Sequence, residues 1–256
     1  METLQVDRAA GVVTVTFDRP HKKNAIDSQM WDELLATAQE IVGSTEDRCV
    51  VLTGAGGDFC SGADLSGEGG LRAHQLANMR RINTVIQAFH DLPQPTIAKV
   101  DGVAAGVGLN LALGCDLVVA SDRSRFSEIF ARRGLSLDGG GTWLLPRLVG
   151  LHKAKELALF AEVISAEEAL ALGIVNRVVP RDQLDALVLD WATRLAAGPP
   201  IALAMTKRML NRSFEQSFEQ ALDDEARAQT VNFGTRDTAE AIAAFLQKRD
   251  PTFEGR

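Results

Sequence analysis

Short runs of β-branched residues alternate with stretches of helical spacing along most of this chain, and this alternation limits the possible folds more than any other feature. Val12–Phe17 alternates valine with threonine, which is typical of a half-buried strand. Residues 30–42 then place apolar side chains at helical spacing, and Asp27 or Ser28 can cap that helix. Further strands are predicted at residues 49–52, Thr96–Val100, 117–120 and 174–179. Strands that alternate with helices predict an α/β fold.

The C-terminal part of the chain has no strand pattern. A Gly-Pro-Pro sequence at residues 198–200 signals a linker, and residues 200–247 read as helix. We therefore expect a core over residues 1–197 and a helical lobe over residues 198–256.

The charge and cysteine content exclude several classes of partner. The chain has 256 residues, a net charge of -7 and a pI of about 5.2, and an acidic protein repels nucleic-acid phosphates. Cys49, Cys60 and Cys115 form no CxxC pair, so we expect no disulfide framework, no zinc site and a cytoplasmic protein. The sequence contains no run of 18 apolar residues and no signal-peptide pattern, so we expect no membrane partner.

Three glycine-bearing segments, residues 59–65, 100–110 and 134–143, carry the chemical signal. Glycine lets a backbone approach a ligand closely. Where a glycine turn leads into a helix, the free N–H groups and the positive end of the helix dipole point at the ligand. Such donors suit a developing oxyanion. The alternative is that the glycines serve only turns and close packing. A dinucleotide-binding turn is disfavoured, because the glycine after Gly106 and Gly108 stands at position 114 rather than 111.

In their order and separation, these segments resemble the signature regions of the enoyl-CoA hydratase/isomerase (crotonase) superfamily. The resemblance covers residues 12–253 and includes residues 18–25, 59–65, 100–120, 164–175 and 245–253. It implies a spiral of ββα units as the acyl-CoA-binding catalytic core and a C-terminal helical oligomerisation lobe. It also implies a homotrimer or a dimer of trimers and an acyl-CoA substrate. Because CoA is part of that substrate, no cofactor and no metal are expected.

The resemblance also assigns roles to individual residues. It implies an oxyanion hole formed by the backbone N–H groups of Ala63 and Val107. It places the following residues in the acyl-CoA groove or at the CoA moiety: Lys22, Lys23, Ala25, Asp64, Leu65, Gly106, Gly108, Asn110 and Phe130. The two lysines have the alternative of a solvated loop.

The acid/base residues decide the reaction. The hydratases of the family use two glutamates, and Asn110 and Phe130 occupy the matching positions here, so that pair is missing. Asp138 matches a catalytic aspartate of the isomerases of phenylacetate degradation, which the segment 134–146 resembles. The resemblance therefore implies isomerisation of an unsaturated acyl-CoA, with Asp138 as the proton shuttle. We expect the apolar neighbours Leu135 and Leu137 to raise its pKa. The alternative role for Asp138 is the N-cap of a helix that begins at Gly139.

Two further functions stay open. Glu128 lies on the same face as Phe130 if the stretch is extended, so Glu128 or Asp138 could act on water in an enoyl-CoA hydratase. The ordinary role for Glu128 is a surface carboxylate paired with Arg132 or Arg133. A non-catalytic acyl-CoA binder is the other alternative, which Asp138 disfavours. We expect the acyl group to be set by residues 66–71, within a mobile loop, and by a helix over residues 72–90.

Overall fold

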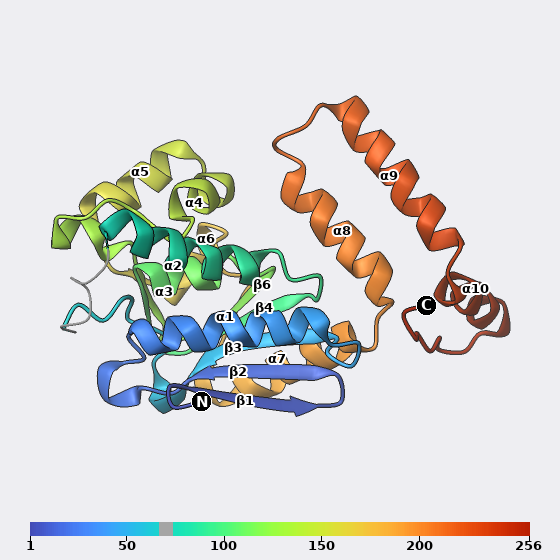
Figure 1. Ribbon diagram of the computed structural model, residues 1–256, viewed down its shortest axis with the longest axis horizontal. Coiled ribbons are helices and arrows are strands. Elements are labelled where there is room, and N and C mark those ends of the chain that lie inside the picture. Colours follow the sequence, from blue (N-terminus) through green and yellow to red (C-terminus); the bar gives the residue numbers. More distant parts are fainter. Residues whose placement is uncertain (67–73) are drawn as a thin grey trace.

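The computed structural model describes residues 1–66 and 74–256 and has a six-stranded sheet at its centre (Figure 1). The strand order is β1-β2-β3-β4-β6-β9, with β1 antiparallel to β2 and the other neighbours parallel. The strands are β1 (Leu4–Ala9), β2 (Val12–Phe17), β3 (Cys49–Gly54), β4 (Thr96–Val100), β6 (Leu117–Ser121) and β9 (Arg177–Val179). Helices connect most of the parallel strands, as parallel pairing requires.

Both faces of this sheet are covered, because alternate residues of its strands face different helices. Val13, Val50 and Val118 lie in the larger core, together with apolar residues of α1 (Ser28–Gly43) and α2 (Gln75–His90). Val51 and Val119 lie in a second core with α7 (Arg181–Ala196). The strand that we expected to be half-buried is therefore covered on both sides, although its threonines stay partly exposed.

A second sheet has the order β5-β7-β8 and is formed by short strands that the sequence did not reveal. They are β5 (Val103–Ala105), β7 (Arg125–Ser127) and β8 (Ile164–Ser165). β5 follows β4 directly and leads into α3 (Val107–Leu113). β7 follows β6 and leads through η4 (Ile129–Arg133) to α4 (Gly141–Val149) and α5 (Leu151–Phe160). Each of these units has two strands and then helix, so the chain has the predicted repeated ββα arrangement.

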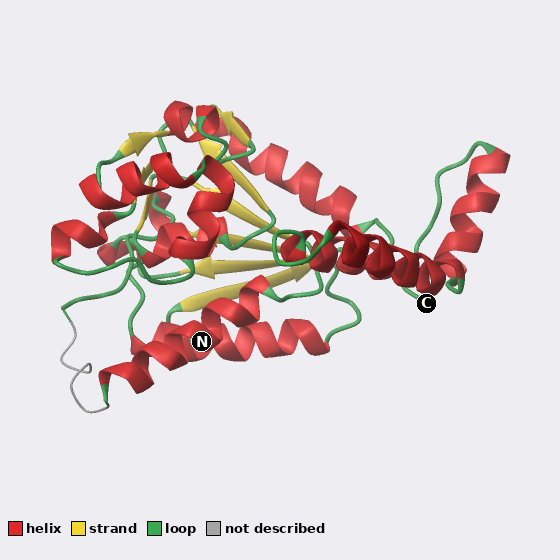
Figure 2. Cartoon of the chain, turned by 90° about the horizontal axis from the view of Figure 1, so that it is seen from above, coloured by secondary structure: helices red, strands yellow, loops and turns green. Residues whose placement is uncertain are grey.

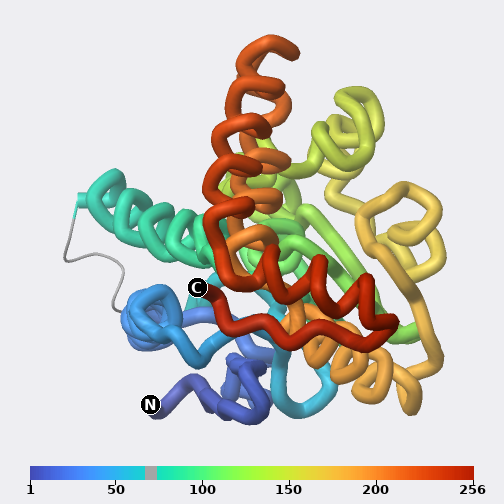
Figure 3. Tube along the Cα trace, turned by 90° about the vertical axis from the view of Figure 1, so that its right-hand side faces the viewer, coloured from blue at the N-terminus to red at the C-terminus, as the bar shows by residue number. Residues whose placement is uncertain are grey.

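The helices α8 (Pro200–Arg212), α9 (Phe218–Phe233) and α10 (Arg236–Gln247) extend away from the sheets (Figure 2). α8 and α9 lie side by side, and α10 runs across their lower end in Figure 3. Much of the apolar surface of these helices is exposed, including Phe218, Phe233 and Phe245, and so is Phe214 in the connection between α8 and α9.

Most predicted elements are confirmed, with differences at their ends. Asp27 caps α1 by accepting a hydrogen bond from the Met30 N–H, and Ser165 and Glu168 form the capping box of α6 (Ala166–Ala171). The predicted continuous C-terminal helix is divided into three. The helix expected from residue 72 is described from Gln75 onward, and most of the loop assigned to the acyl group lies outside the described residues.

Candidate active site

Two glycine-containing turns run side by side between the two sheets. The Cys60 N–H donates to the Val103 carbonyl at 2.9 Å, and the Ala105 N–H donates to the Cys60 carbonyl at 2.9 Å. This is the hydrogen-bond pattern of parallel strands, and it forms an isolated parallel β-bridge between Cys60 and Ala104. Three residues further along each segment come Ala63 and Val107. The register therefore brings the two predicted oxyanion-hole residues to neighbouring places.

Glycine is required at both turns. Gly62 has φ +105° and Gly106 has φ +53°, conformations that side chains disfavour. A Cβ at Gly62 would also lie 3.1 Å from the Ala105 carbonyl oxygen. These two glycines let one backbone lie directly against the other.

The N–H groups of Ala63 and Val107 remain available as donors. Val107 is the first residue of α3, where the helix offers no acceptor. Within residues 1–66 and 74–256, neither N–H is found in a hydrogen bond. The segment around Ala63 is fixed on both sides, because the Ile26 N–H donates to the Gly62 carbonyl at 2.8 Å and the Asp64 N–H donates to the Ile26 carbonyl at 2.9 Å. Two fixed backbone donors are what an oxyanion hole needs.

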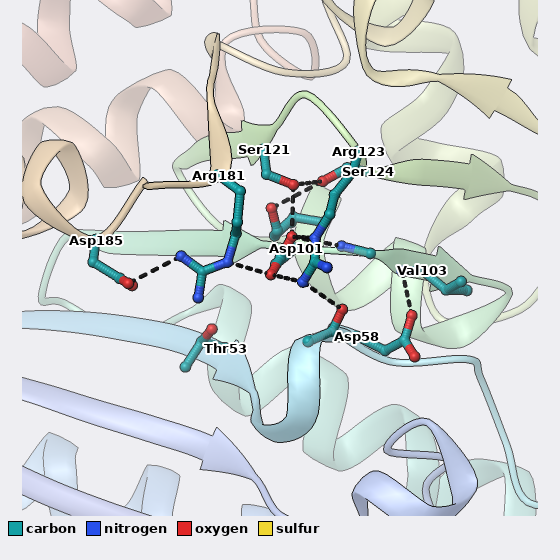
Figure 4. Close-up of polar contacts among 12 residues, drawn as sticks. Thr53, Asp58, Asp101, Val103, Ser121, Arg123, Ser124, Arg181 and Asp185 are labelled. Carbon is teal, nitrogen blue, oxygen red and sulfur yellow. Dashed lines mark hydrogen bonds and ion pairs between the residues drawn. The ribbon is translucent and has the colours of Figure 1, made fainter. Parts of the chain in front are cut away.

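A buried aspartate holds the turn that follows β4 (Figure 4). The Asp101 carboxylate accepts hydrogen bonds from the Ser121 hydroxyl at 2.7 Å and the Gly102 N–H at 3.1 Å. It is also paired with Arg123 and Arg181 at 2.5 Å each. Burial favours the neutral acid, but these hydrogen bonds and positive charges outweigh it and lower the pKa of Asp101. The carboxylate is thus ionised and fixes the turn.

The same turn packs directly on the segment that leads to Ala63. The Asp58 carboxylate accepts a hydrogen bond from the Val103 N–H at 2.9 Å (Figure 4). Gly102 has φ +58°, and a Cβ there would lie 2.3 Å from the Gly57 carbonyl oxygen. This packing keeps the two turns that carry Ala63 and Val107 in register.

Asp138 precedes α4 but does not cap it. The helix begins at Gly141, and its N-cap is Gly140, with no side-chain capping bond. Gly139 and Gly140 have φ +59° and +84°, so they turn the chain before the helix starts. The alternative in which Asp138 caps a helix beginning at Gly139 is therefore wrong. The Asp138 side chain is partly buried, and its Oδ1 atom is buried without a hydrogen-bond partner.

Asn110 connects Asp138 to a second carboxylate. It lies three residues after Val107, on the same face of α3, and is completely buried. Its Nδ2 atom donates to the Asp138 backbone carbonyl at 2.8 Å and lies 3.4 Å from Glu128 Oε2. A Cβ at Gly141 would lie 2.6 Å from this amide nitrogen, so the glycine provides the space that Asn110 occupies.

Glu128 is buried in the site, which sequence reasoning did not favour. Its exposed fraction is 2%, whereas Arg132 and Arg133 are exposed. No ion pair of Glu128 is found in the described part of the chain, so the ordinary role proposed for it is wrong. The extended arrangement with Phe130 is also wrong, because η4 begins directly after Glu128. The sequence contains one indication that Glu128 is buried, because it is a single charged residue close to Phe126, Ile129 and Phe130 along the chain.

Both carboxyl groups have a raised pKa. Burial raises the pKa of Glu128 to about 7, the nearby Asp138 charge adds to the effect, and the hydrogen bond from Asn110 opposes it. Burial alone raises the pKa of Asp138 to about 6. Leu135 was expected to contribute to the burial of Asp138, but its side chain is 52% exposed and does not do so. Two carboxyl groups that titrate near neutral pH can exchange protons with a substrate.

Phe130 and Gly108 pack around the donors. Phe130 is buried, and its Cζ atom would lie 3.7 Å from a Cβ at Gly106, so it forms an apolar wall beside that turn. A Cβ at Gly108 would lie 2.6 Å from the Cys60 carbonyl oxygen. Gly108 therefore serves the close packing of α3 on the first segment, and its assignment to substrate binding stays a prediction.

The residues assigned to CoA lie on one side of the first segment. Lys22 donates to the Ser66 hydroxyl at 3.0 Å, and Lys23 is paired with Asp58 at 3.7 Å. Ala25 is buried, and both lysines are exposed. Their CoA contacts stay a prediction.

Asp64 and Leu65 directly follow Ala63, the first of the two predicted oxyanion-hole residues. Asp64 accepts hydrogen bonds from the hydroxyl and N–H of Ser66 and from Arg19, and these lower its pKa. It is therefore a fixed anion rather than a proton carrier. Leu65 is 67% exposed, as an apolar residue at the rim of a groove can be.

Residues 1–66 and 74–256 contain no group of three or more His, Cys, Asp or Glu placed to hold a metal ion. In the same residues, each helix is too short or too polar to cross a bilayer.

Comparisons with known proteins agree over almost the whole chain. Residues 7–256 match the family model described as enoyl-CoA hydratase/isomerase. A Rhodobacter capsulatus protein named "Probable enoyl-CoA hydratase" is 40% identical, covering 99% of this chain and 98% of the relative. The 1,2-epoxyphenylacetyl-CoA isomerase of Escherichia coli is 36% identical, covering 96% of each chain.

The solved structures give the same result. The crystal structure of an enoyl-CoA hydratase from Bacillus anthracis superposes with a TM-score of 0.95 at 32% identity, covering 99% of this chain and 100% of that one. A structure from Streptomyces coelicolor, described as a putative enoyl-CoA hydratase, has a TM-score of 0.94 at 36% identity, covering 99% and 94%.

Proposed function

The chain belongs to the enoyl-CoA hydratase/isomerase family and is an enzyme that acts on enoyl-CoA thioesters, and from this premise we propose that it moves the double bond of an unsaturated acyl-CoA. The observation that carries the proposal is the position of Asp138. Its side chain is partly buried, and its backbone carbonyl accepts a hydrogen bond from Asn110, which lies on the face of α3 that begins with Val107. The two family glutamate positions hold Asn110 and Phe130, neither of which can transfer a proton.

The proposed chemistry begins at the thioester carbonyl. Its oxygen accepts hydrogen bonds from the N–H groups of Ala63 and Val107, which stabilise the enolate that forms when a proton leaves C2. The Asp138 carboxylate takes this proton, and a proton is then added at C4. The raised pKa of Asp138, about 6, suits both steps, because the group can hold either state near neutral pH.

Binding and assembly complete the proposal. Lys22, Lys23 and Ala25 hold the CoA moiety, while Asp64 and Leu65 line the groove. The exposed phenylalanines of α9, α10 and the connection between α8 and α9 support a homotrimer or a dimer of trimers, with residues 198–256 as the oligomerisation lobe. The three free cysteines are consistent with a cytoplasmic location.

Hydration of a 2-enoyl-CoA is the second candidate, and the buried Glu128 favours it. Hydration requires one group to take a proton from water and another to give a proton to C2. Glu128 and Asp138 are two such groups, since the Asn110 amide donates to the Glu128 carboxyl group and to the backbone carbonyl of Asp138.

The test is turnover of a 3-enoyl-CoA beside hydration of a 2-enoyl-CoA, with wild-type enzyme and with Asp138→Asn. We expect isomerisation to dominate and to fall by about 10²–10⁴ in the variant, the usual loss for a positioned acid or base. Binding of a saturated acyl-CoA is expected to persist, since the oxyanion donors are backbone groups. An Asp138→Asn enzyme that isomerises at the wild-type rate would remove the proposed role.

A further inference from the structure

Three buried oxygen atoms without hydrogen-bond partners lie together at the carboxylate pair. They are Asn110 Oδ1, Glu128 Oε1 and Asp138 Oδ1. Buried polar atoms nearly always have partners, and those that lack them often belong to functional sites. All three are acceptors when the carboxyl groups are ionised, so the site is suited to groups that bring or exchange protons.

Glu128 is held close to the oxyanion turn by its backbone. The Gly106 N–H donates to the carbonyl of Ser127, the preceding residue, at 2.9 Å. A Cβ at Gly106 would lie 3.4 Å from the side chain of Ile129, the next residue. The residues on either side of Glu128 therefore touch the turn that presents Val107.

The charge balance explains how two carboxyl groups share this place. Neither Glu128 nor Asp138 has a cationic partner in the described ranges 1–66 and 74–256. Asn110 donates through one nitrogen to Glu128 and to the Asp138 backbone. A single neutral amide cannot neutralise two carboxylate charges. The Asp138 charge disfavours ionisation of Glu128. Between the pKa of Asp138, about 6, and that of Glu128, about 7, Asp138 is mostly ionised and Glu128 mostly keeps its proton, so the two groups together hold about one proton.

We propose that Glu128 is a second catalytic residue, which shares one proton with Asp138 so that one carboxyl group takes a proton from the substrate while the other donates one. This inference rests on the proposed function and deepens it.

In the isomerisation, the Asp138 carboxylate removes hydrogen from C2. The C2–H electron pair passes into the C1–C2 bond, and negative charge develops on the thioester oxygen between the two N–H donors. The neutral Glu128 carboxyl group then protonates C4. The carbonyl re-forms, and the double bond lies between C2 and C3. Asp138 is now neutral and Glu128 ionised, so one proton passes from Asp138 back to Glu128 before the next turnover.

A single-residue shuttle and a shared proton differ in the fate of the hydrogen taken from C2. We therefore propose a single-turnover reaction, with the enzyme in excess over a substrate deuterated at C2 and the label at C4 of the product measured by mass spectrometry. The shared-proton arrangement predicts little direct transfer, because the hydrogen added at C4 comes from Glu128. Transfer of most of the label from C2 to C4 would overturn the inference.

Substitution gives the second readout. Glu128→Gln is expected to lower isomerisation or hydration by about 10²–10⁴, to keep affinity for butyryl-CoA, and to retain exchange of the C2 hydrogen of that saturated thioester with D₂O. Glu128→Asp, which keeps a carboxyl group, is expected to recover part of the rate. The exposed Glu162 is the matched control, and Glu162→Gln is expected to behave as wild type.

The outcomes separate the two claims. Wild-type enzyme that turns over neither a 3-enoyl-CoA nor a 2-enoyl-CoA overturns the proposed function. Wild-type turnover that survives Glu128→Gln within about threefold overturns the inference alone. Retained butyryl-CoA binding in the variant excludes misfolding as the cause of a lost rate.

Discussion

Replacement of Glu128 by glutamine is expected to change how the stability of the protein depends on pH. In the folded protein the pKa of Glu128 is raised to about 7 from its ordinary value of 4.5, chiefly by burial. Between these two values the folded protein holds a proton that the unfolded chain releases. The free energy of unfolding therefore falls as the pH rises from about 4.5 to about 7.

The size of the effect follows from the shift. Because each pKa unit corresponds to about 1.4 kcal/mol, the ionised Glu128 costs the folded state about 3 kcal/mol above pH 7. Glutamine has nearly the same shape and stays neutral. Its amide group can also donate to the unpartnered Oδ1 of Asn110 or of Asp138. At pH 5 wild type and variant are thus expected to be similarly stable, and at pH 8 the variant is expected to be more stable by about 3 kcal/mol.

The assay is urea unfolding followed by fluorescence of the three tryptophans, at pH 5 and pH 8 and at one fixed protein concentration. The relevant quantity is the change in the difference between the two proteins, since contributions from groups that do not interact with Glu128 cancel. Glu162→Gln is the control and is expected to show no such change. A difference that stays constant between the two pH values, within about 0.5 kcal/mol, would refute the buried ionisation on which the argument depends.

Three other results are expected. The rate of isomerisation is expected to be highest between about pH 6 and pH 7, because Asp138 must be ionised and Glu128 neutral. In Glu128→Gln the fall of the rate on the alkaline side should disappear. The same alkaline fall in both enzymes would contradict these roles. Gly108→Ala is expected to lower the free energy of unfolding by about 1–3 kcal/mol, because the new Cβ would lie 2.6 Å from the Cys60 carbonyl oxygen. A variant with the wild-type free energy of unfolding in urea would show that α3 can move to make room. Light scattering at micromolar concentration is expected to give a trimer or hexamer, and a monomer would refute the role of α8, α9 and α10.

The sequence determined the architecture and the glycine turns that present the N–H groups of Ala63 and Val107. Val12–Phe17 and the helix after Asp27 were recognisable because strand and helix periodicity are local properties of the chain. The turns at Gly62 and Gly106 were recognisable for the same reason, since only glycine readily adopts their positive φ angles. The short strands β5, β7 and β8 were missed, because two or three residues carry no periodicity and form a strand only when a neighbour pairs with them.

Only the tertiary structure decided what the carboxyl groups of the site do. Asp138 precedes a glycine run that resembles a helix start, yet two positive φ angles move the start to Gly141 and free the side chain. Glu128 looked like a surface residue beside two arginines, and packing buried it against Asn110, 18 residues earlier in the chain. The ionisation of a carboxyl group depends on the solvent it loses and the charges it meets, and both are set by segments that meet only after folding.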